Sequence, residues 1–197
     1  MGSKPKIAIF ASGGGSNLQA VIDACKTDIL NATVCVVISN NSKSGALQRA
    51  IDAGIPAFHI SRKTTANPDA TILQTLLSHN PNMILLAGYL KKIGAGVLQQ
   101  YQGKIYNIHP ALLPKYGGQG MFGINVHQAV IAAGEMTTGI TIHKVDPEYD
   151  TGEIIAQCIV PVQPGDTAET LSARVLEREH TFLVETLRAV FNNGIYK

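Results

Sequence analysis

Short apolar runs alternate with amphipathic stretches through the first half of the chain. The apolar runs have the length of strands and lie at 6–11, 33–38, 57–60, 82–87 and 104–109. The stretches between them carry apolar residues at helical spacing, near 18–25, 44–53, 69–78 and 96–101. Strands that alternate with helices form parallel βαβ units. The pattern therefore predicts an α/β fold: a doubly wound, mostly parallel sheet with helices on both faces.

The pattern loosens after Tyr116. A glycine-rich loop, a helix, two strands and a long helix are predicted in turn, at 117–123, 125–133, 138–145, 153–160 and 167 to about 191. An acidic loop, 146–152, joins the two strands. We expect a single domain, 1–197, with a phosphate- and nucleotide-binding half at 1–103 and a catalytic half at 104–197.

Composition narrows the class of protein. A hydrophobic content of 45% and a charged content of 15% fit a soluble globular protein, and a net charge of +2 argues against a large nucleic-acid surface. The apolar run Ile7–Ala11 is too short for a signal sequence or a membrane span. The three scattered cysteines, with no C-x-x-C pair, suit the reducing cytosol. We expect a cytoplasmic protein that binds neither membranes nor nucleic acid.

A glycine turn, Ser12–Asn17, lies between the first predicted strand and its helix. Successive backbone N–H groups in such a turn, beside a helix N-terminus, form a binding site for an anion. Ser16 and Asn17 can cap the helix and can also donate to a phosphate. We therefore expect one phosphate here, and a tight turn without a ligand is the alternative.

The same turn matches a dinucleotide-binding fingerprint only in part. Gly13 and Gly15 fit the first two glycines of G-x-G-x-x-G, but Leu18 stands where the third belongs. The next strand ends in Ser39 and Asn40, with no carboxylate for a ribose hydroxyl. A nicotinamide cofactor is therefore not expected.

Asn107 and His109 alternate on a short strand that Pro110 ends. Their side chains are expected to share one face of the sheet, at the carboxyl end of a parallel strand, where open α/β sheets place ligands. Asn107 can donate two amide hydrogens to a developing oxyanion, and His109 can act as an acid or an imidazolium donor. A purely structural histidine is the alternative.

A nearby carboxylate would favour the charged form of His109. The candidates in the acidic loop are Asp146, Glu148 and Asp150, and spacing alone does not choose among them. No H-E-x-x-H or Cys/His cluster and no G-x-S-x-G elbow occurs, so neither a metal nor a hydrolase nucleophile is expected.

Three motifs now stand together: N-I-H-P at 107–110, L-L-P at 112–114 and D-T-G at 150–152. They resemble the folate-dependent formyltransferase family. With S-G-G-G-S-N-L at 12–18, the chain is similar to the members that act in purine biosynthesis. The resemblance runs from the first strand to about His180, and it implies a Rossmann-like formyltransferase fold.

The resemblance also implies a reaction. A formyl group would pass from 10-formyltetrahydrofolate to the amine of 5′-phosphoribosylglycinamide, without a metal, by direct attack of the neutral amine. The family's catalytic trio corresponds to Asn107, His109 and Asp150. Asn107 and a protonated His109 would stabilise the tetrahedral intermediate, and Asp150 would support the imidazolium.

Binding roles follow from the same resemblance. The phosphate would lie on Gly14, Gly15, Ser16 and Asn17. Folate would bind Leu90, Lys91, Lys92, Ile93, Asn107, Val145, Asp146 and Asp150. Glu179 would contact the amine end of the substrate or, alternatively, is an exposed helix residue. The loop 117–123 is longer and more glycine-rich than in familiar members, and the family's basic residue near Arg62 and Lys63 has no single match.

Other relatives share the trio. We expect neither the C-terminal tRNA-binding domain of methionyl-tRNA formyltransferase nor the N-terminal domain of formyltetrahydrofolate hydrolase, and sugar-nucleotide formyltransferases usually lack this phosphate loop. A non-catalytic nucleotide-binding module is the alternative from another class. The expected partners are small molecules, with the protein as a monomer or a homodimer.

Overall fold

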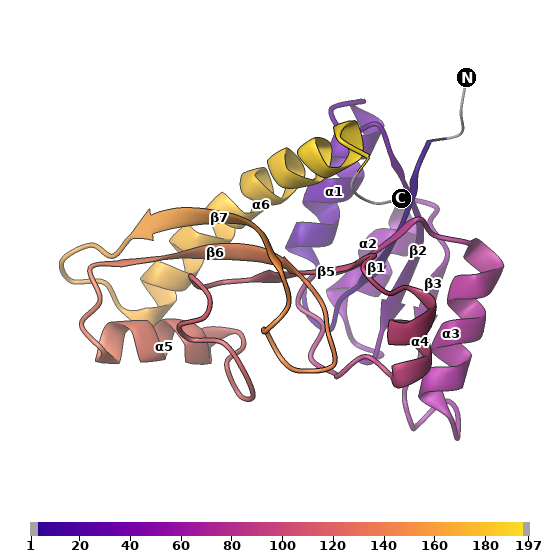
Figure 1. Cartoon of the computed structure of the whole chain (residues 1–197), viewed down its shortest axis with the longest axis horizontal. Coiled ribbons are helices and arrows are strands. Elements are labelled where there is room, and N and C mark those ends of the chain that lie inside the picture. The colour runs from indigo at the N-terminus through magenta and orange to yellow at the C-terminus, as the bar shows by residue number, and fades with distance from the viewer. Residues whose placement is uncertain (1–3, 195–197) are drawn as a thin grey trace.

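The computed structural model describes residues 4–194 and contains a seven-stranded sheet of order β3-β2-β1-β4-β5-β6-β7 (Figure 1). The strands are β1 (Lys6–Phe10), β2 (Thr33–Ser39), β3 (Ala57–His59), β4 (Met83–Leu86), β5 (Ile105–His109), β6 (Thr137–Lys144) and β7 (Ile154–Pro161). The helices are α1 (Ser16–Lys26), α2 (Gly45–Asp52), α3 (Pro68–His79), α4 (Ala95–Gln100), α5 (Ile124–Ala132) and α6 (Ala168–Asn192). β1 to β5 pair in parallel, whereas β6 and β7 are antiparallel. The predicted fold class is confirmed.

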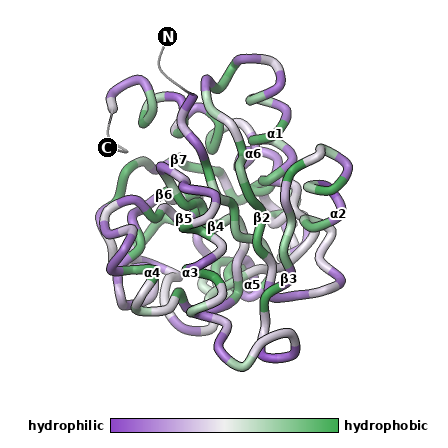
Figure 2. Tube along the Cα trace, turned by 90° about the vertical axis from the view of Figure 1, so that its right-hand side faces the viewer, coloured by the Kyte–Doolittle hydropathy of each residue, from purple (hydrophilic) through white to green (hydrophobic). Residues whose placement is uncertain are grey.

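The sheet is buried on both faces, which is why its parallel strands are continuous apolar runs. In β1, Ile7 and Ile9 pack into the cluster that contains residues of α1, α2, α5 and α6. Ala8 and Phe10 point the other way, into the cluster that contains residues of α3 and α4. Figure 2 shows this core as hydrophobic strands surrounded by hydrophilic loops.

Local signals explain where three of the described helices begin. The side chain of Ser44 caps α2, Asn67 caps α3, and Thr167 forms a capping box with Thr170 at the start of α6. Among the described residues, no side chain caps α4 or α5, and the same holds for α1, where Ser16 and Asn17 were expected to cap. Its N-cap is Gly15, in the left-handed conformation at φ +77°, and no side chain caps it. The sharp turn puts Ser16 and Asn17 inside the first turn of the helix instead.

The connection pattern changes direction between β1 and β4. The sheet grows from β1 through β2 to β3 on one side, and from β4 through β5 on the other. Loops from the two sides part at such a switch point, so the carboxyl ends of the strands there border a crevice. Because β6 runs antiparallel beside β5, His143 lies directly opposite Asn107.

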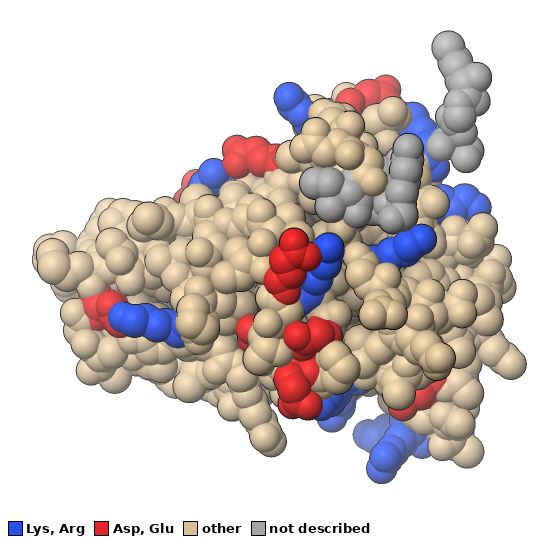
Figure 3. Space-filling model, viewed as in Figure 1, with Lys and Arg blue, Asp and Glu red and all other residues tan. Residues whose placement is uncertain are grey.

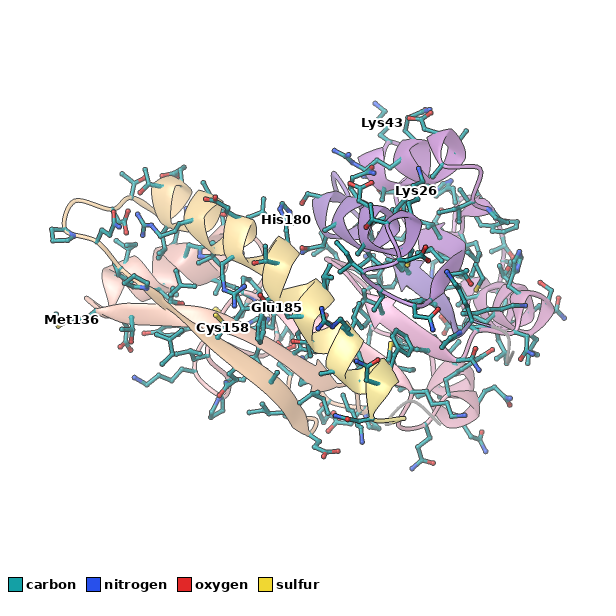
Figure 4. The ribbon with its side chains drawn as sticks, turned by 90° about the horizontal axis from the view of Figure 1, so that it is seen from above. Lys26, Lys43, Met136, Cys158, His180 and Glu185 are labelled. Carbon is teal, nitrogen blue, oxygen red and sulfur yellow. The ribbon has the colours of Figure 1, made fainter. Side chains whose placement is uncertain are left out.

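The molecule is longest in the direction in which β6 and β7 extend. Figure 4 shows Met136, before β6, at one end of this direction. Within residues 4–194, no helix is both long enough and apolar enough to cross a membrane.

Candidate active site

A cavity of about 420 Å³ lies at the carboxyl ends of β1, β4 and β5. Ligand pockets of small-molecule enzymes have volumes of this order. Every residue assigned to the site from the sequence lines it: Gly14, Gly15, Ser16, Asn17, Leu90, Lys91, Lys92, Ile93, Asn107, His109, Val145, Asp146, Asp150 and Glu179. Both halves of the chain contribute, so the expected division at 103/104 does not separate two sites.

The proposed trio meets at the end of β5. The Asp150 carboxylate reaches back over the strand, with Oδ2 3.8 Å from His109 Nδ1 and Oδ1 3.4 Å from Asn107 Nδ2. Asp150 has φ +56°, a conformation that is costly for a non-glycine residue and that gathers at functional sites. The N–H of Gly118 donates to Oδ2 at 2.9 Å.

The surroundings of His109 act on its pKa in opposite directions. His109 is 4% exposed, and burial lowers its pKa below 6.5 despite the opposing effects of Asp150 and the Tyr116 carbonyl. This shift favours the neutral ring over the imidazolium. Its Nε2 donates to the carbonyl oxygen of Tyr116 at 2.7 Å, which leaves Nδ1, on the side of Asp150, free to accept a proton.

Asp150 itself is ionised. Burial raises its pKa, but the neighbouring His143, the hydrogen bond from the Gly118 N–H and the proximity of His109 outweigh burial and lower the pKa below its usual range. A neutral imidazole thus faces a carboxylate, and that carboxylate stabilises the imidazolium once a proton arrives.

His143 is a site residue that the sequence reasoning missed. Its Nδ1 donates to the Lys144 carbonyl oxygen at 2.8 Å, which leaves Nε2 as the ring atom that faces Asn107. The Nδ2 of Asn107 lies 3.1 Å from that nitrogen and donates to it. Asn107 Nδ2 thus has two acceptors, His143 Nε2 at 3.1 Å and Asp150 Oδ1 at 3.4 Å, and the longer bond to Asp150 is the one that an incoming oxyanion would replace.

The glycine turn offers N–H groups to the cavity. Its carbonyl oxygens face away: that of Gly13 accepts from Ser44 Oγ at 2.7 Å, and that of Gly14 accepts from Arg49 Nε at 2.9 Å. Within residues 4–194, no acceptor is bonded to the N–H groups of Gly13 through Asn17. Such a row of free donors at the start of α1 suits an anion.

Glu179 is buried, and the interpretation of it as an exposed helix residue is wrong. It is 6% exposed and accepts a hydrogen bond from Asn17 Nδ2 at 2.7 Å. Burial raises its pKa to about 7, although the Asn17 hydrogen bond lowers it. Within the described residues, Asn17 Oδ1 is buried with no partner. The side chain of Asn17 thus points at Glu179, and its expected donation to a phosphate falls to the backbone.

The comparisons with known proteins agree with this geometry. Residues 5–187 match the model of the formyl transferase family. The chain belongs to this family. Membership of this family implies a formyl donor of the folate type.

Two curated relatives show how far the likeness extends. The chain is 44% identical over 196 residues to the chloroplastic phosphoribosylglycinamide formyltransferase of Vigna unguiculata, a match that covers 98% of this chain and 62% of that protein. It is 42% identical over 178 residues to phosphoribosylglycinamide formyltransferase of Haemophilus influenzae, covering 89% of this chain and 82% of that one. The chain thus spans less than two thirds of the plant protein.

The solved structures agree. Glycinamide ribonucleotide transformylase 1 from Symbiobacterium toebii superposes with a TM-score of 0.90 at 34% identity, covering 98% of this chain and 90% of that one. Phosphoribosylglycinamide formyltransferase from Brucella melitensis superposes with a TM-score of 0.86 at 39% identity, covering 94% and 95%.

Two loops, 90–93 and 145–150, also border the cavity. Leu90 is anchored by its N–H, which donates to Ser12 Oγ at 2.9 Å, and Lys92 lies 4.0 Å from Glu148 and 5.5 Å from the centre of the Tyr149 ring. Acidic side chains gather on the face in Figure 3 that carries the loop after β6. One loop follows β4 and the other follows β6, so two distant parts of the sequence meet at the cavity.

A second missed histidine lies deeper. His127 of α5 is 3% exposed and lines the cavity, and burial followed by the charge of His109 lowers its pKa to about 4. It stays neutral beside His109. No His, Cys, Asp or Glu cluster suited to a metal ion occurs within residues 4–194.

Proposed function

We propose that the chain transfers a formyl group from 10-formyltetrahydrofolate to the amine of 5′-phosphoribosylglycinamide, a step of purine biosynthesis. The observation that carries the proposal is the continuity of one cavity, which joins a loop of free N–H groups to Asn107, His109 and Asp150. A substrate with a phosphate at one end and an amine at the other fits such an arrangement. The acceptors named in its relatives have that form.

The neutral resting state of His109 suggests the order of proton movements. The amine attacks the formyl carbon, and an Asn107 amide hydrogen stabilises the negative charge that develops on the formyl oxygen. His109 Nδ1 then takes a proton from the attacking nitrogen, and the Asp150 carboxylate stabilises the resulting imidazolium. As the bond from the formyl carbon to N10 breaks, the imidazolium returns the proton to N10.

Substrate binding follows from the ends of the cavity. The phosphate accepts from the N–H groups of Gly14 to Asn17. Glu179 accepts hydrogen bonds from the substrate. Because Glu179 is bonded to Asn17 of the phosphate-binding turn, its partners in this proposal are the ribose hydroxyls and not the amine that the resemblance assigns to it. Folate lies between 90–93 and 145–150, with backbone groups of these loops reading its pterin edge. The three cysteines, all free, suit a cytoplasmic enzyme.

The test is a panel of acceptors. Purified protein with 10-formyltetrahydrofolate is supplied in turn with 5′-phosphoribosylglycinamide, the same compound without its phosphate, a methionyl-tRNA and a sugar-nucleotide amine. Formylated product should form only with the first, and only weakly without the phosphate. Equal turnover of the tRNA or of the amino sugar would overturn the proposal.

A further inference from the structure

The loop between β5 and α5 brings two apolar side chains to the cavity. Met121 and Phe122, here called the apolar tip, both line it. Phe122 is 49% exposed, although a phenyl ring is usually buried in a core. Packing in a core therefore does not account for the position of the Phe122 side chain.

The backbone fixes the position of the tip. Gly118, Gly120 and Gly123 have φ values of +93°, +88° and +55°, conformations that side chains rarely adopt. The N–H of Met121 donates to the Gly118 carbonyl at 3.1 Å. The Gly120 carbonyl accepts from Phe122 N at 3.2 Å and from Asn125 Nδ2 at 3.1 Å. The loop is therefore a built turn that presents two apolar groups.

The start of this loop lies against the reacting centre. The N–H of Gly118 donates to Asp150 Oδ2 at 2.9 Å. At Gly117 a Cβ would lie 2.5 Å from Leu113 Cδ2 and 3.2 Å from Asp150 Cβ, so a larger residue there would have to displace the Leu113 side chain. The tip thus follows, by four to five residues, the glycine that packs against Asp150.

The chemistry creates a need for such a group. A formyl carbon activated for an amine is also activated for water, which is far more concentrated than any amine. In hydrolysis the water oxygen bonds to the formyl carbon, the bond from that carbon to N10 breaks, and N10 takes one proton. Formic acid then leaves and ionises to formate. Apolar groups at the cavity limit this reaction because they can neither bind nor orient a water molecule.

We propose that the apolar tip makes this site select amine over water, so that the formyl donor is transferred and not hydrolysed. The inference rests on the proposed function for the identity of the donor. It assigns a specificity role to a loop for which the family resemblance gives none.

The experiment measures two products from the same donor. Phe122→Ser and Phe122→Leu are compared with the unmodified protein, and formate and formylated amine are both quantified. F122S should raise the ratio of formate to transferred formyl by about tenfold or more, whereas F122L, which stays apolar, should change it little. F58S is the matched control, because Phe58 of β3 is 38% exposed and does not line the cavity. It should leave the ratio unchanged.

Formate release without any acceptor separates this inference from the proposed function. If the unmodified protein fails to formylate phosphoribosylglycinamide while F122S still releases formate faster, the proposed function fails and the role of the tip stands. If transfer proceeds normally and F122S gives the same ratio of formate to transferred formyl as the unmodified protein, the proposed role of the tip is wrong. A rise of the same size in F58S would overturn it as well.

Discussion

The two ends of the cavity are built differently. At the β1 end, the glycine turn offers main-chain N–H groups from one short segment, while Ser44 and Arg49 hold its carbonyl oxygens away. At the β5 end, chemistry depends on side chains from β5, β6 and the loop after β6. In the proposed function, the first end would bind through backbone geometry and the second would act through charge and protonation.

Because of this difference, the two ends should tolerate different kinds of mutation. Backbone donors survive most changes of side chain but not a change of conformation. Side-chain donors and acids survive small shifts of the chain but not a change of chemical group. Mutations at the two ends should therefore affect different kinetic quantities, and the following predictions use that contrast.

Gly15→Ala should have the largest effect on the β1 end. Gly15 has φ +77°, and an added Cβ would lie 2.7 Å from Ala46 Cα. We expect a loss of about 1–3 kcal/mol of unfolding free energy and a rise in the KM for the phosphorylated amine of roughly tenfold or more, because the N–H groups shift. Urea denaturation and steady-state kinetics measure the two effects.

Gly13→Ala is the matched control for that variant. A Cβ on Gly13 meets nothing within 4 Å and Gly13 has no positive φ. Its stability should equal that of the unmodified protein. If G13A and G15A destabilise equally, the turn does not depend on the conformation of Gly15.

Glu179→Gln should raise stability while lowering activity. Between about pH 4.5 and 7 the folded carboxyl keeps a proton that the unfolded chain has lost, so the unfolding free energy falls as pH rises through this window. Glutamine carries no such charge. At pH 8, E179Q should be more stable than the unmodified protein by roughly 1–3 kcal/mol, with kcat/KM for the amine reduced. Denaturation at pH 8 and pH 4 checks this, since the gain should vanish at pH 4.

His143 should give the smallest effect. His143→Leu removes the acceptor of the Asn107 amide and leaves a buried donor unpaired, which should lower kcat about tenfold. His143→Gln can keep an acceptor there and should retain most of the activity. Steady-state rates of the two variants decide, and equal rates in both would show that the amide needs no partner from β6.

Much of the fold could be predicted because its signals are local. The parallel strands are apolar runs, Ser44, Asn67 and Thr167 mark helix starts, and the turn at 12–17 is contiguous. The site at β5 was harder. Asn107 and His109 follow from strand alternation, but the choice of Asp150 came from the family resemblance.

Three features escaped prediction for physical reasons. His143 enters the site only through its antiparallel register with Asn107, which no local pattern fixes. The neutral state of His109 depends on burial, which opposes the charge of Asp150. Glu179 was assigned to the site, but its burial was left open, and it could have been predicted because Glu179 continues the apolar stripe of Leu171, Val175 and Phe182 along α6.

A single-turnover experiment on His109→Ala tests most directly whether the β5 end carries the chemistry. Enzyme in excess over 10-formyltetrahydrofolate is mixed with increasing phosphoribosylglycinamide, which gives a limiting rate and a half-saturation concentration. The limiting rate should fall by roughly 10²–10⁴, while half-saturation stays within about threefold because the phosphate is held by backbone at the other end. An unchanged limiting rate, or a change in half-saturation alone, would contradict the account.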